Sequence, residues 1–173
     1  MRPYASVGLL PSDVEIALER TACFGSCPAY RVTVKATGEV QYEGLRYVKM
    51  TGRHNGKIDE KEALNLVREL LLLRFFDADD KYAGRDNMML YNDRLIIGRT
   101  VISDAHATIL SLKLGKDKKS VQIYDSDPLR LLEIAKKLDD VVEIEQWIGT
   151  YCERPRSRIG PAIQPGECGQ PAP

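Results

Sequence analysis

Apolar and polar positions alternate in two short segments near the start of the chain, one over residues 14–19 and one over residues 30–35. A period of two is typical of a β-strand that buries one face. Thr37-Gly38 then supplies a tight turn, because glycine tolerates the positive φ that such turns need. A third strand is predicted from Val40 to Val48, and Gly44 inside it predicts a bulge.

The pattern changes at Asp59 from the period of a strand to that of a helix. Residues 51–57 just before it are rich in glycine and asparagine, and they are predicted to form a turn region. Asp59 and Glu62 have the spacing of a capping box, in which each side chain satisfies a free backbone N–H group at the helix start. Apolar residues then recur at helical spacing, which predicts a buried helix that ends near residues 74–76.

The second half of the chain is less regular at first. Residues 77–99 have no clean period, and they are predicted to form a long loop with one short strand. Alternation returns over residues 108–114 and 120–124, with a hairpin loop between them. Asp127-Pro128 is a strong helix start, since aspartate is a favoured N-cap and proline fits the first helical position. Helical turns are predicted as far as Gly149.

The order of these elements predicts the fold class. Short turns between consecutive strands favour antiparallel pairing, and two amphipathic helices need a sheet face to cover. We therefore expect an α+β fold in the order βββ-α-ββ-α, with an antiparallel sheet of about five to six strands and both helices packed on one face. One domain is predicted over residues 13–149, with a loose lead-in over 1–12 and a Pro/Gly-rich tail over 150–173.

The composition is that of an ordinary soluble globular protein, and it narrows the choice of partners. The chain of 173 residues has 25 Lys and Arg against 25 Asp and Glu, so it lacks the basic excess typical of nucleic-acid binding. No apolar run reaches the ~18–20 residues of a membrane span. The N-terminus lacks the apolar segment of a signal peptide, which predicts a cytoplasmic protein if the chain is complete. Paired cysteines would instead indicate an extracytoplasmic protein whose signal peptide was removed.

Candidate chemistry gathers in one stretch between the first two strands, Cys23-Phe24-Gly25-Ser26-Cys27-Pro28-Ala29-Tyr30. The first interpretation of Cys23 and Cys27 is a disulfide, which requires the chain to curl until the two Cα atoms lie ~4.4–6.8 Å apart. The second interpretation is a zinc site, which needs two further ligands from distant parts of the chain. The third is a redox or nucleophilic thiol, which needs a basic neighbour to lower its pKa.

The other two cysteines, Cys152 and Cys168, lie in the predicted tail. With His54 they are the only distant side chains that fit a zinc site with the first pair. They can also form a second disulfide, worth ~3 kcal/mol by the loop-entropy model. Four cysteines allow three pairings, and the sequence does not choose among them.

A few further side chains are candidates for binding. Phe24 lies between the first two cysteines, and Tyr30 is one of several strand tyrosines that would form a binding face if exposed. His54 is predicted in the turn region, where a solvated histidine is the alternative to a functional one. Asp104 shares a strand face with His106, and a plain surface pair is the alternative to a carboxylate that orients an imidazole.

The cysteine stretch, with Glu19-Arg20-Thr21 before it, resembles the signature of a bacterial family. That family is catalogued as a domain of unknown function and is numbered six-four-three-eight. The likeness continues through Tyr42-Glu43-Gly44 and Trp147-Ile148-Gly149, so it spans roughly residues 14–149. The resemblance implies no activity, substrate or cofactor. Members of the family often look like exported proteins or lipoproteins, whereas this chain shows no signal peptide.

No acid, base and nucleophile converge in the sequence, which favours a non-enzymatic binding or structural module with a locked cysteine loop and no cofactor. The alternative is a thiol-dependent redox protein or enzyme that uses Cys23 and Cys27, and the second alternative is a structural zinc domain. The expected partner is an unidentified protein or small molecule. The sequence does not set the oligomeric state.

Overall fold

The computed structural model describes residues 8–100, 106–124 and 129–155. Within these ranges the chain forms a large sheet, a separate two-stranded sheet and three α-helices. This arrangement confirms the predicted α+β class. The predicted start of the second helix, Asp127-Pro128, lies outside the described residues.

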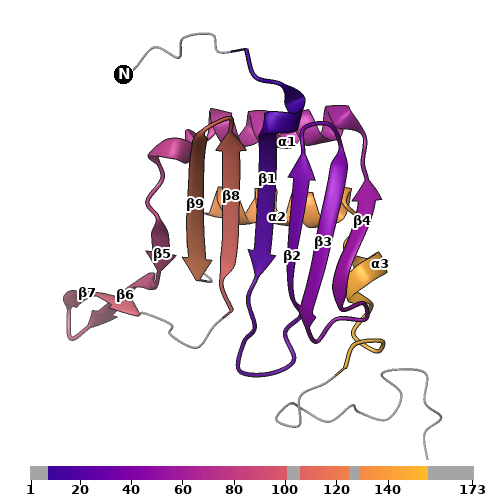
Figure 1. The fold of residues 1–173 in the computed structure, drawn as a ribbon. Coiled ribbons are helices and arrows are strands. Elements are labelled where there is room, and N and C mark those ends of the chain that lie inside the picture. The colour runs from indigo at the N-terminus through magenta and orange to yellow at the C-terminus, as the bar shows by residue number, and fades with distance from the viewer. Residues whose placement is uncertain (1–7, 101–105, 125–128, 156–173) are drawn as a thin grey trace, which may run out of the picture.

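Seven strands make up the large sheet. They are β1 (Val14–Arg20), β2 (Ala29–Lys35), β3 (Glu39–Arg46), β4 (Gly52–Lys57), β5 (Lys81–Ala83), β8 (Thr108–Leu114) and β9 (Asp117–Tyr124). Their order across the sheet is β4-β3-β2-β1-β8-β9-β5, so β1 lies at the centre (Figure 1). All neighbouring strands are antiparallel except β5 and β9, which run parallel.

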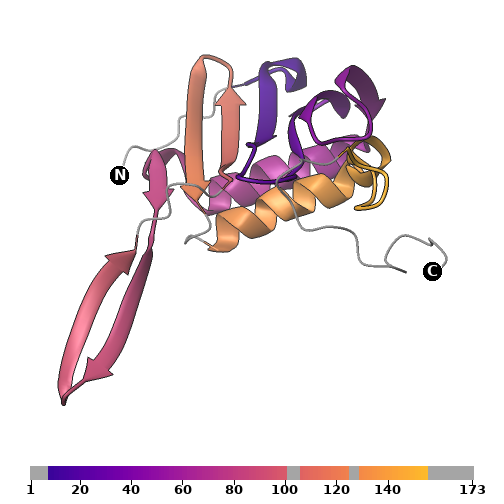
Figure 2. The ribbon, with the colours of Figure 1, turned by 90° about the horizontal axis from the view of Figure 1, so that it is seen from below.

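The helices cover one face of this sheet. Helices α1 (Glu60–Leu72) and α2 (Leu129–Val141) lie side by side beneath the strands, and the opposite face is open (Figure 2). The short helix α3 (Glu145–Ile148) closes the end near β3 and β4, where the N–H groups of Lys49 and Met50 donate to the carbonyl groups of Ile148 and Trp147. Two helices on one face agree with the prediction, and α3 adds a third.

Alternate residues of the central strands point toward the helices and form the core. In β1 and β2 these include Ile16, Leu18 and Val32, each at most 1% exposed. They pack with Leu70 and Leu138 of the two helices. A slip of one residue in either strand would turn this apolar set toward water, so the core fixes the register of β1 and β2. The loop between these two strands therefore starts from two firmly placed ends.

The bulge predicted at Gly44 is present. The pairing of β2 with β3 passes from Ala29↔Arg46 to Tyr30↔Gly44, which leaves Leu45 as the extra residue. A Cβ atom on Gly44 would lie 2.1 Å from the carbonyl oxygen of Met50, so no larger residue fits there. The chain can therefore fold back at this point toward β4.

The prediction of a turn region over residues 51–57 is wrong, because this segment forms the edge strand β4. It pairs with β3 from Gly44↔Gly52 to Glu39↔Lys57. Glycine weakens a strand in isolation, but here it makes room for a neighbour. A Cβ atom on Gly56 would lie 3.0 Å from the ring of Trp147, so the glycine lets the indole pack on the strand.

The long loop predicted over residues 77–99 is also wrong. The segment begins with a short 3-10 turn, Phe75–Asp77, and continues through β5 into two strands that pair only with each other, β6 (Arg85–Tyr91) and β7 (Arg94–Thr100). The period-two signal is absent because this hairpin has apolar residues on both faces. The predicted count of five to six strands in the main sheet is also too low, because the sheet has seven and the sequence of β4 indicates a turn.

In the part of the chain that the structure describes, no helix is long and apolar enough to span a membrane.

Candidate functional site

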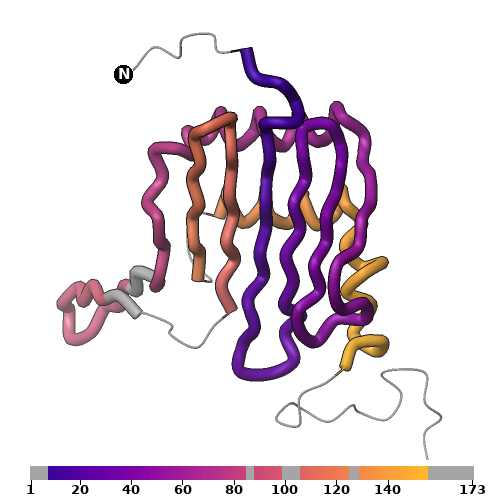
Figure 3. The backbone as a smooth tube through the Cα atoms, viewed as in Figure 1, coloured from indigo at the N-terminus to yellow at the C-terminus, as the bar shows by residue number. Residues whose placement is uncertain are grey.

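The cysteine loop, residues 21–28, joins the end of β1 to the start of β2 at one end of the sheet (Figure 3). Cys23 and Cys27 form a disulfide, with their Cα atoms 5.6 Å apart. Inside the ring, the N–H group of Gly25 donates to the carbonyl oxygen of Cys23 at 2.9 Å. The disulfide interpretation of this pair is therefore confirmed, and the chain curls as the short spacing requires.

Phe24 lies between the two bridged cysteines and points into solvent. Its exposed fraction is 80%, the highest among the large apolar residues that the structure describes. The two cysteines are half-buried, and Ala29 and Tyr30 just beyond the loop are buried. The loop is thus closed at its base and presents one aromatic ring at its tip.

Both strands that carry the loop are held by the same carboxylate on α2. Arg20, the last residue of β1, donates from Nη2 to Oδ2 of Asp139 at 2.8 Å. Tyr30 on β2 donates from its hydroxyl to Oδ1 of Asp139 at 2.7 Å. Arg20 also donates from Nη1 to the hydroxyl oxygen of Thr108 on β8 at 2.6 Å. We call Arg20, Tyr30, Thr108 and Asp139 the anchor cluster.

In the anchor cluster, Arg20 and Asp139 form an ion pair, and the phenol of Tyr30 is neutral. Burial raises the pKa of Asp139, and the Arg20 guanidinium offsets part of that rise. Burial and the Asp139 carboxylate both raise the pKa of Tyr30, so its hydroxyl stays protonated and remains a donor. Burial disfavours the charge on Arg20, but the attraction of Asp139 outweighs it and the pKa of Arg20 is raised. A buried pair of this kind is worth more for fixing geometry than for net stability.

A second tie holds the first residue of the loop. The N–H group of Thr21 donates to the carbonyl oxygen of Ala107 at 3.0 Å. In return, the N–H group of Ala107 donates to the Thr21 hydroxyl oxygen at 2.7 Å. The loop is therefore connected to the segment before β8 as well as to α2, and its base has little freedom to move.

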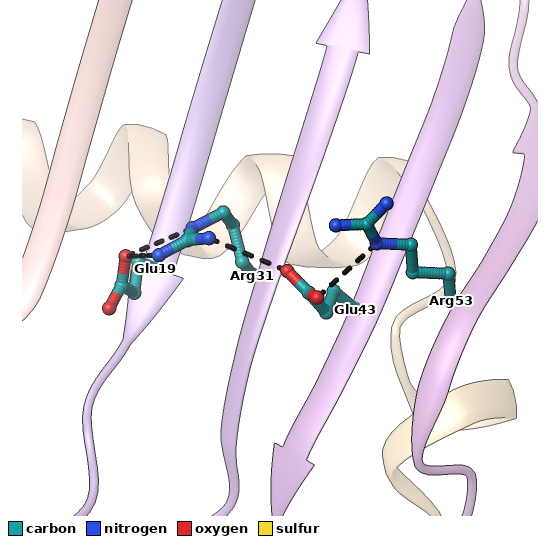
Figure 4. A network of polar contacts seen from close by, with 4 residues as sticks. All are labelled: Glu19, Arg31, Glu43 and Arg53. Carbon is teal, nitrogen blue, oxygen red and sulfur yellow. Dashed lines mark hydrogen bonds and ion pairs between the residues drawn. The ribbon is translucent and has the colours of Figure 1, made fainter.

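The open face of the sheet carries a different kind of polar group, a ladder of alternating charge across four strands. Figure 4 shows Glu19, Arg31, Glu43 and Arg53 in a row from β1 to β4. Arg31 lies 2.7 Å from Glu19 and 3.4 Å from Glu43, and Arg53 lies 3.4 Å from Glu43. Exposed pairs of this kind contribute about 0–1 kcal/mol each. Because these charges pair with one another, the ladder offers no unpaired charge to a ligand.

Of the other predicted candidates, the structure describes His54, Tyr30 and Cys152. His54 lies on β4, with Nε2 3.0 Å from the carbonyl oxygen of Thr51 and its ring packed near Tyr42. Tyr30 is buried in the anchor cluster and is not part of an exposed tyrosine face. Cys152 is itself disulfide-bonded. Asp104 and Cys168 lie outside the described residues.

Asp139 and Thr108 are the site residues that sequence reasoning missed. Asp139 follows Leu138 and lies four positions after Ala135, so it falls within the buried stripe of α2. An acidic residue on the apolar side of a helix needs a partner, because an unpaired buried charge is costly. The position of Asp139 on the apolar side of the helix could therefore have indicated a buried polar contact. In the structure, Arg20 and Tyr30 are its partners.

The chain is thus an α+β domain whose central strands end in an anchored, disulfide-closed loop. A family model described as a domain of unknown function (DUF6438) matches residues 14–142, and the chain belongs to this family. The match confirms the resemblance given by the cysteine stretch, and it ends before Trp147-Ile148-Gly149. It includes the cysteine loop and the whole anchor cluster. No protein with a curated description matches the chain.

Proposed function

We propose that the protein is a binding module that presents Phe24 to a pocket on a partner protein. The observation that carries this proposal is the 80% exposure of Phe24 at the tip of a disulfide-closed loop. Aromatic residues that enter a partner's pocket often dominate the energy of an interface. Burying such a ring in a partner's pocket would contribute about 1.5–3 kcal/mol of favourable free energy.

The ties at the loop base support this use of Phe24. Arg20, Tyr30 and Thr21 each fix the ends of the loop through hydrogen bonds. The disulfide then limits the motion between those ends. A loop that is ordered before binding loses less conformational freedom on binding, which favours affinity.

The redox alternative uses the same cysteines but finds less support. A reactive thiol needs a basic neighbour that stabilises its thiolate. Arg20 is engaged by Asp139 and Thr108, and Arg31 is engaged by Glu19 and Glu43. Both nearby arginines therefore have other acceptors.

The zinc alternative lacks a donor set in the part of the chain that the structure describes. There, no three His, Cys, Asp or Glu side chains lie close enough together to hold a metal ion. Cys23 and Cys27 are bonded to each other, so neither is a thiolate ligand in this state.

Photo-crosslinking tests the proposal directly. The photoreactive residue p-benzoylphenylalanine replaces Phe24 in one protein and Leu72 in a matched control, because Leu72 has a similar exposed fraction of 72% on α1. Each protein is irradiated in an extract of the cells that contain it, and adducts are identified by mass. The identified partner is then purified, and its affinity for the unlabelled chain is measured with and without Phe24→Ala.

The expected result is a discrete adduct at position 24 that is absent at position 72. Phe24→Ala should weaken binding of the purified partner by about 30-fold or more, the loss typical of a central aromatic side chain. Opening the loop with dithiothreitol should weaken binding as well. Adducts that are the same at both positions, or an affinity that Phe24→Ala leaves unchanged, would refute the proposal. Reversible oxidation of a substrate at the expense of the disulfide would favour the redox alternative.

A further inference from the structure

The hairpin of β6 and β7 is the second feature that extends beyond the sheet, and it is unlike the cysteine loop. Seven residue pairs join its strands, from Arg85↔Thr100 to Tyr91↔Arg94. Asn92 and Asp93 form its turn with positive φ angles of 49° and 58°, as a type I′ hairpin turn requires. Figure 2 shows the hairpin projecting away from the sheet and both long helices.

One face of the hairpin is an uninterrupted apolar patch. Residues that are directly opposite in an antiparallel pair share a face, so the pairs Met88↔Ile97 and Leu90↔Leu95 lie together. We call these four residues the arm patch. Their exposed fractions are 71% for Met88, 73% for Leu90, 58% for Leu95 and 71% for Ile97. The side chains of the arm patch are therefore largely in water.

The opposite face is smaller and less uniform. It carries the pair Met89↔Ile96, with exposed fractions of 60% and 45%, and the pair Tyr91↔Arg94 next to the turn. Arg94 thus lies on this second face, whereas the four residues of the arm patch are all apolar and the pair Asp86↔Arg99 follows them in register only toward the base of the hairpin. The two faces provide a matched comparison within one hairpin.

Two general properties indicate that the arm patch is covered by another molecule. A two-stranded hairpin with no further packing is marginally stable at best in water. Contiguous exposed apolar patches also mark surfaces that meet another molecule. The hairpin has a well-formed turn and a complete ladder, so we expect a partner surface to supply the missing packing.

We propose that the arm patch binds the arm patch of a second copy of this chain, forming a two-fold symmetric dimer. A two-fold interface requires a surface that is complementary to itself, and an apolar patch without charges meets that requirement. Homodimer interfaces are more apolar than interfaces between proteins that also exist apart. The four side chains of the arm patch expose on the order of 500 Å² in each copy, so the dimer would bury about 1,000 Å² in total, which is the lower limit for a specific interface.

The geometry of the hairpin permits this dimer. Strands of seven residues extend about 23 Å, and two apolar sheets pack about 10 Å apart. Antiparallel stacking of two hairpins would place the polar turn of each beside the base of the other. The two domains would then lie at opposite ends of the stacked pair.

A membrane surface fits the hairpin less well. Its tip is Asn92-Asp93-Arg94, which is polar and opposes insertion of the tip into lipid. The hairpin, residues 85–100, has three arginines against two aspartates, and the chain has no net charge that would attract it strongly to anionic lipid. A vesicle experiment is nevertheless included because lipid is the natural competitor for an exposed apolar patch.

Sedimentation equilibrium over a range of protein concentrations tests the proposal with three proteins. They are the wild type, Leu90→Lys/Ile97→Lys in the arm patch, and the matched control Met89→Lys/Ile96→Lys on the opposite face. A fourth protein, in which Asn-Gly replaces residues 88–97, removes the patch without adding charge. Circular dichroism and thermal unfolding confirm that each variant keeps the domain folded. Flotation with phosphatidylcholine–phosphatidylglycerol vesicles tests the wild type and the arm-patch variant for lipid binding.

The wild type should be a dimer at micromolar concentration, and the control should remain one. The arm-patch variant should raise the dimer dissociation constant by about 100-fold or more, since two charges enter the centre of the interface. The shortened variant should be a monomer. A wild type that is monomeric at 200 μM, a dimer that survives the arm-patch changes, or flotation that depends on Leu90 and Ile97 would each overturn the proposal.

Discussion

The cysteine loop and the β6–β7 hairpin both extend from the sheet and both expose apolar side chains, but they are held in place differently. The loop is closed by a disulfide and tied at its base by Arg20, Thr21 and Tyr30. The hairpin is held by its own ladder of seven pairs and by the chain that enters and leaves it. The loop is therefore held in place by contacts within its own domain, whereas the hairpin depends on another surface for its packing.

This difference separates two ways of exposing apolar surface. The loop exposes one ring on a rigid base, as expected for a contact that forms and dissociates. The hairpin exposes a broad patch on a marginally stable element, as expected for an interface that stays covered. Substitutions that loosen the loop should leave the hairpin unchanged, so the hairpin serves as an internal reference.

Asp139→Ala should have the largest effect. It leaves the Arg20 guanidinium buried without its carboxylate, and breaking a buried ion pair in this way costs about 3–5 kcal/mol. Asp140→Ala is the matched control, because Asp140 forms an exposed pair with Lys136 on the same helix and should cost less than about 1 kcal/mol. Denaturant unfolding measures both changes. Amide hydrogen exchange should rise in the cysteine loop and stay constant in the hairpin, and equal exchange in the two regions would contradict the comparison.

Tyr30→Phe should have the next largest effect, because it removes a hydrogen bond to a carboxylate worth about 1.5–3 kcal/mol. It should also change the response to alkaline pH. Burial and Asp139 raise the pKa of Tyr30 above its ordinary value near 10, so its contribution to stability is present below pH 10 and is lost as the pH rises further. As the pH rises above 10, the free energy of unfolding of the wild type should fall more steeply than that of Tyr30→Phe, by a difference that approaches about 1.4 kcal/mol per pH unit.

Denaturant unfolding at several pH values between 9 and 11 measures this difference. Tyr42, whose pKa burial raises to about 12, is present in both proteins and provides a common background. Parallel pH profiles for the two proteins would show that Tyr30 ionises as freely in the folded protein as in the unfolded chain.

Cys23→Ser/Cys27→Ser should lower the free energy of unfolding by about 2 kcal/mol, because the ring is short and constrains the unfolded chain only weakly. The larger change should be local. Without the bridge, amide exchange in the loop should rise while the anchor cluster remains protected. Loss of protection at Tyr30 would show that the bridge, and not Asp139, holds the base of the loop.

Much of the fold follows from the sequence because its strands and helices bury one face each. The alternation over β1, β2, β8 and β9 reports directly which residues enter the core. The pattern fails at β4, because glycines such as Gly52 and Gly56 locally indicate a turn. In the structure Gly56 instead leaves the space that Trp147 needs. It also fails at the hairpin, since a strand with apolar residues on both faces does not show the alternation of apolar and polar residues that predicts a strand.

The cysteine loop is predictable in part for a similar reason. The spacing of Cys23 and Cys27 allows a curl and a bridge, which are local properties of the chain. The anchor cluster is not local, because Arg20 and Asp139 are separated by 119 positions. Only the fold brings α2 beneath the ends of β1 and β2, and so only the structure shows what Asp139 does.

Gly25→Ala should have the smallest effect on stability of these changes, and it tests the backbone geometry at the tip of the loop. Gly25 has a positive φ of 159°, which residues with a side chain rarely adopt, so an alanine there is strained although its Cβ atom would meet only Cys23 Sγ at an ordinary 3.6 Å. The free energy of unfolding should therefore fall by about 1 kcal/mol, and amide exchange should rise in the loop and stay constant in the hairpin. If Phe24 enters a partner's pocket, Gly25→Ala should also weaken partner binding, because the strained backbone carries that ring. An unchanged free energy of unfolding would show that the loop accommodates the methyl group without strain.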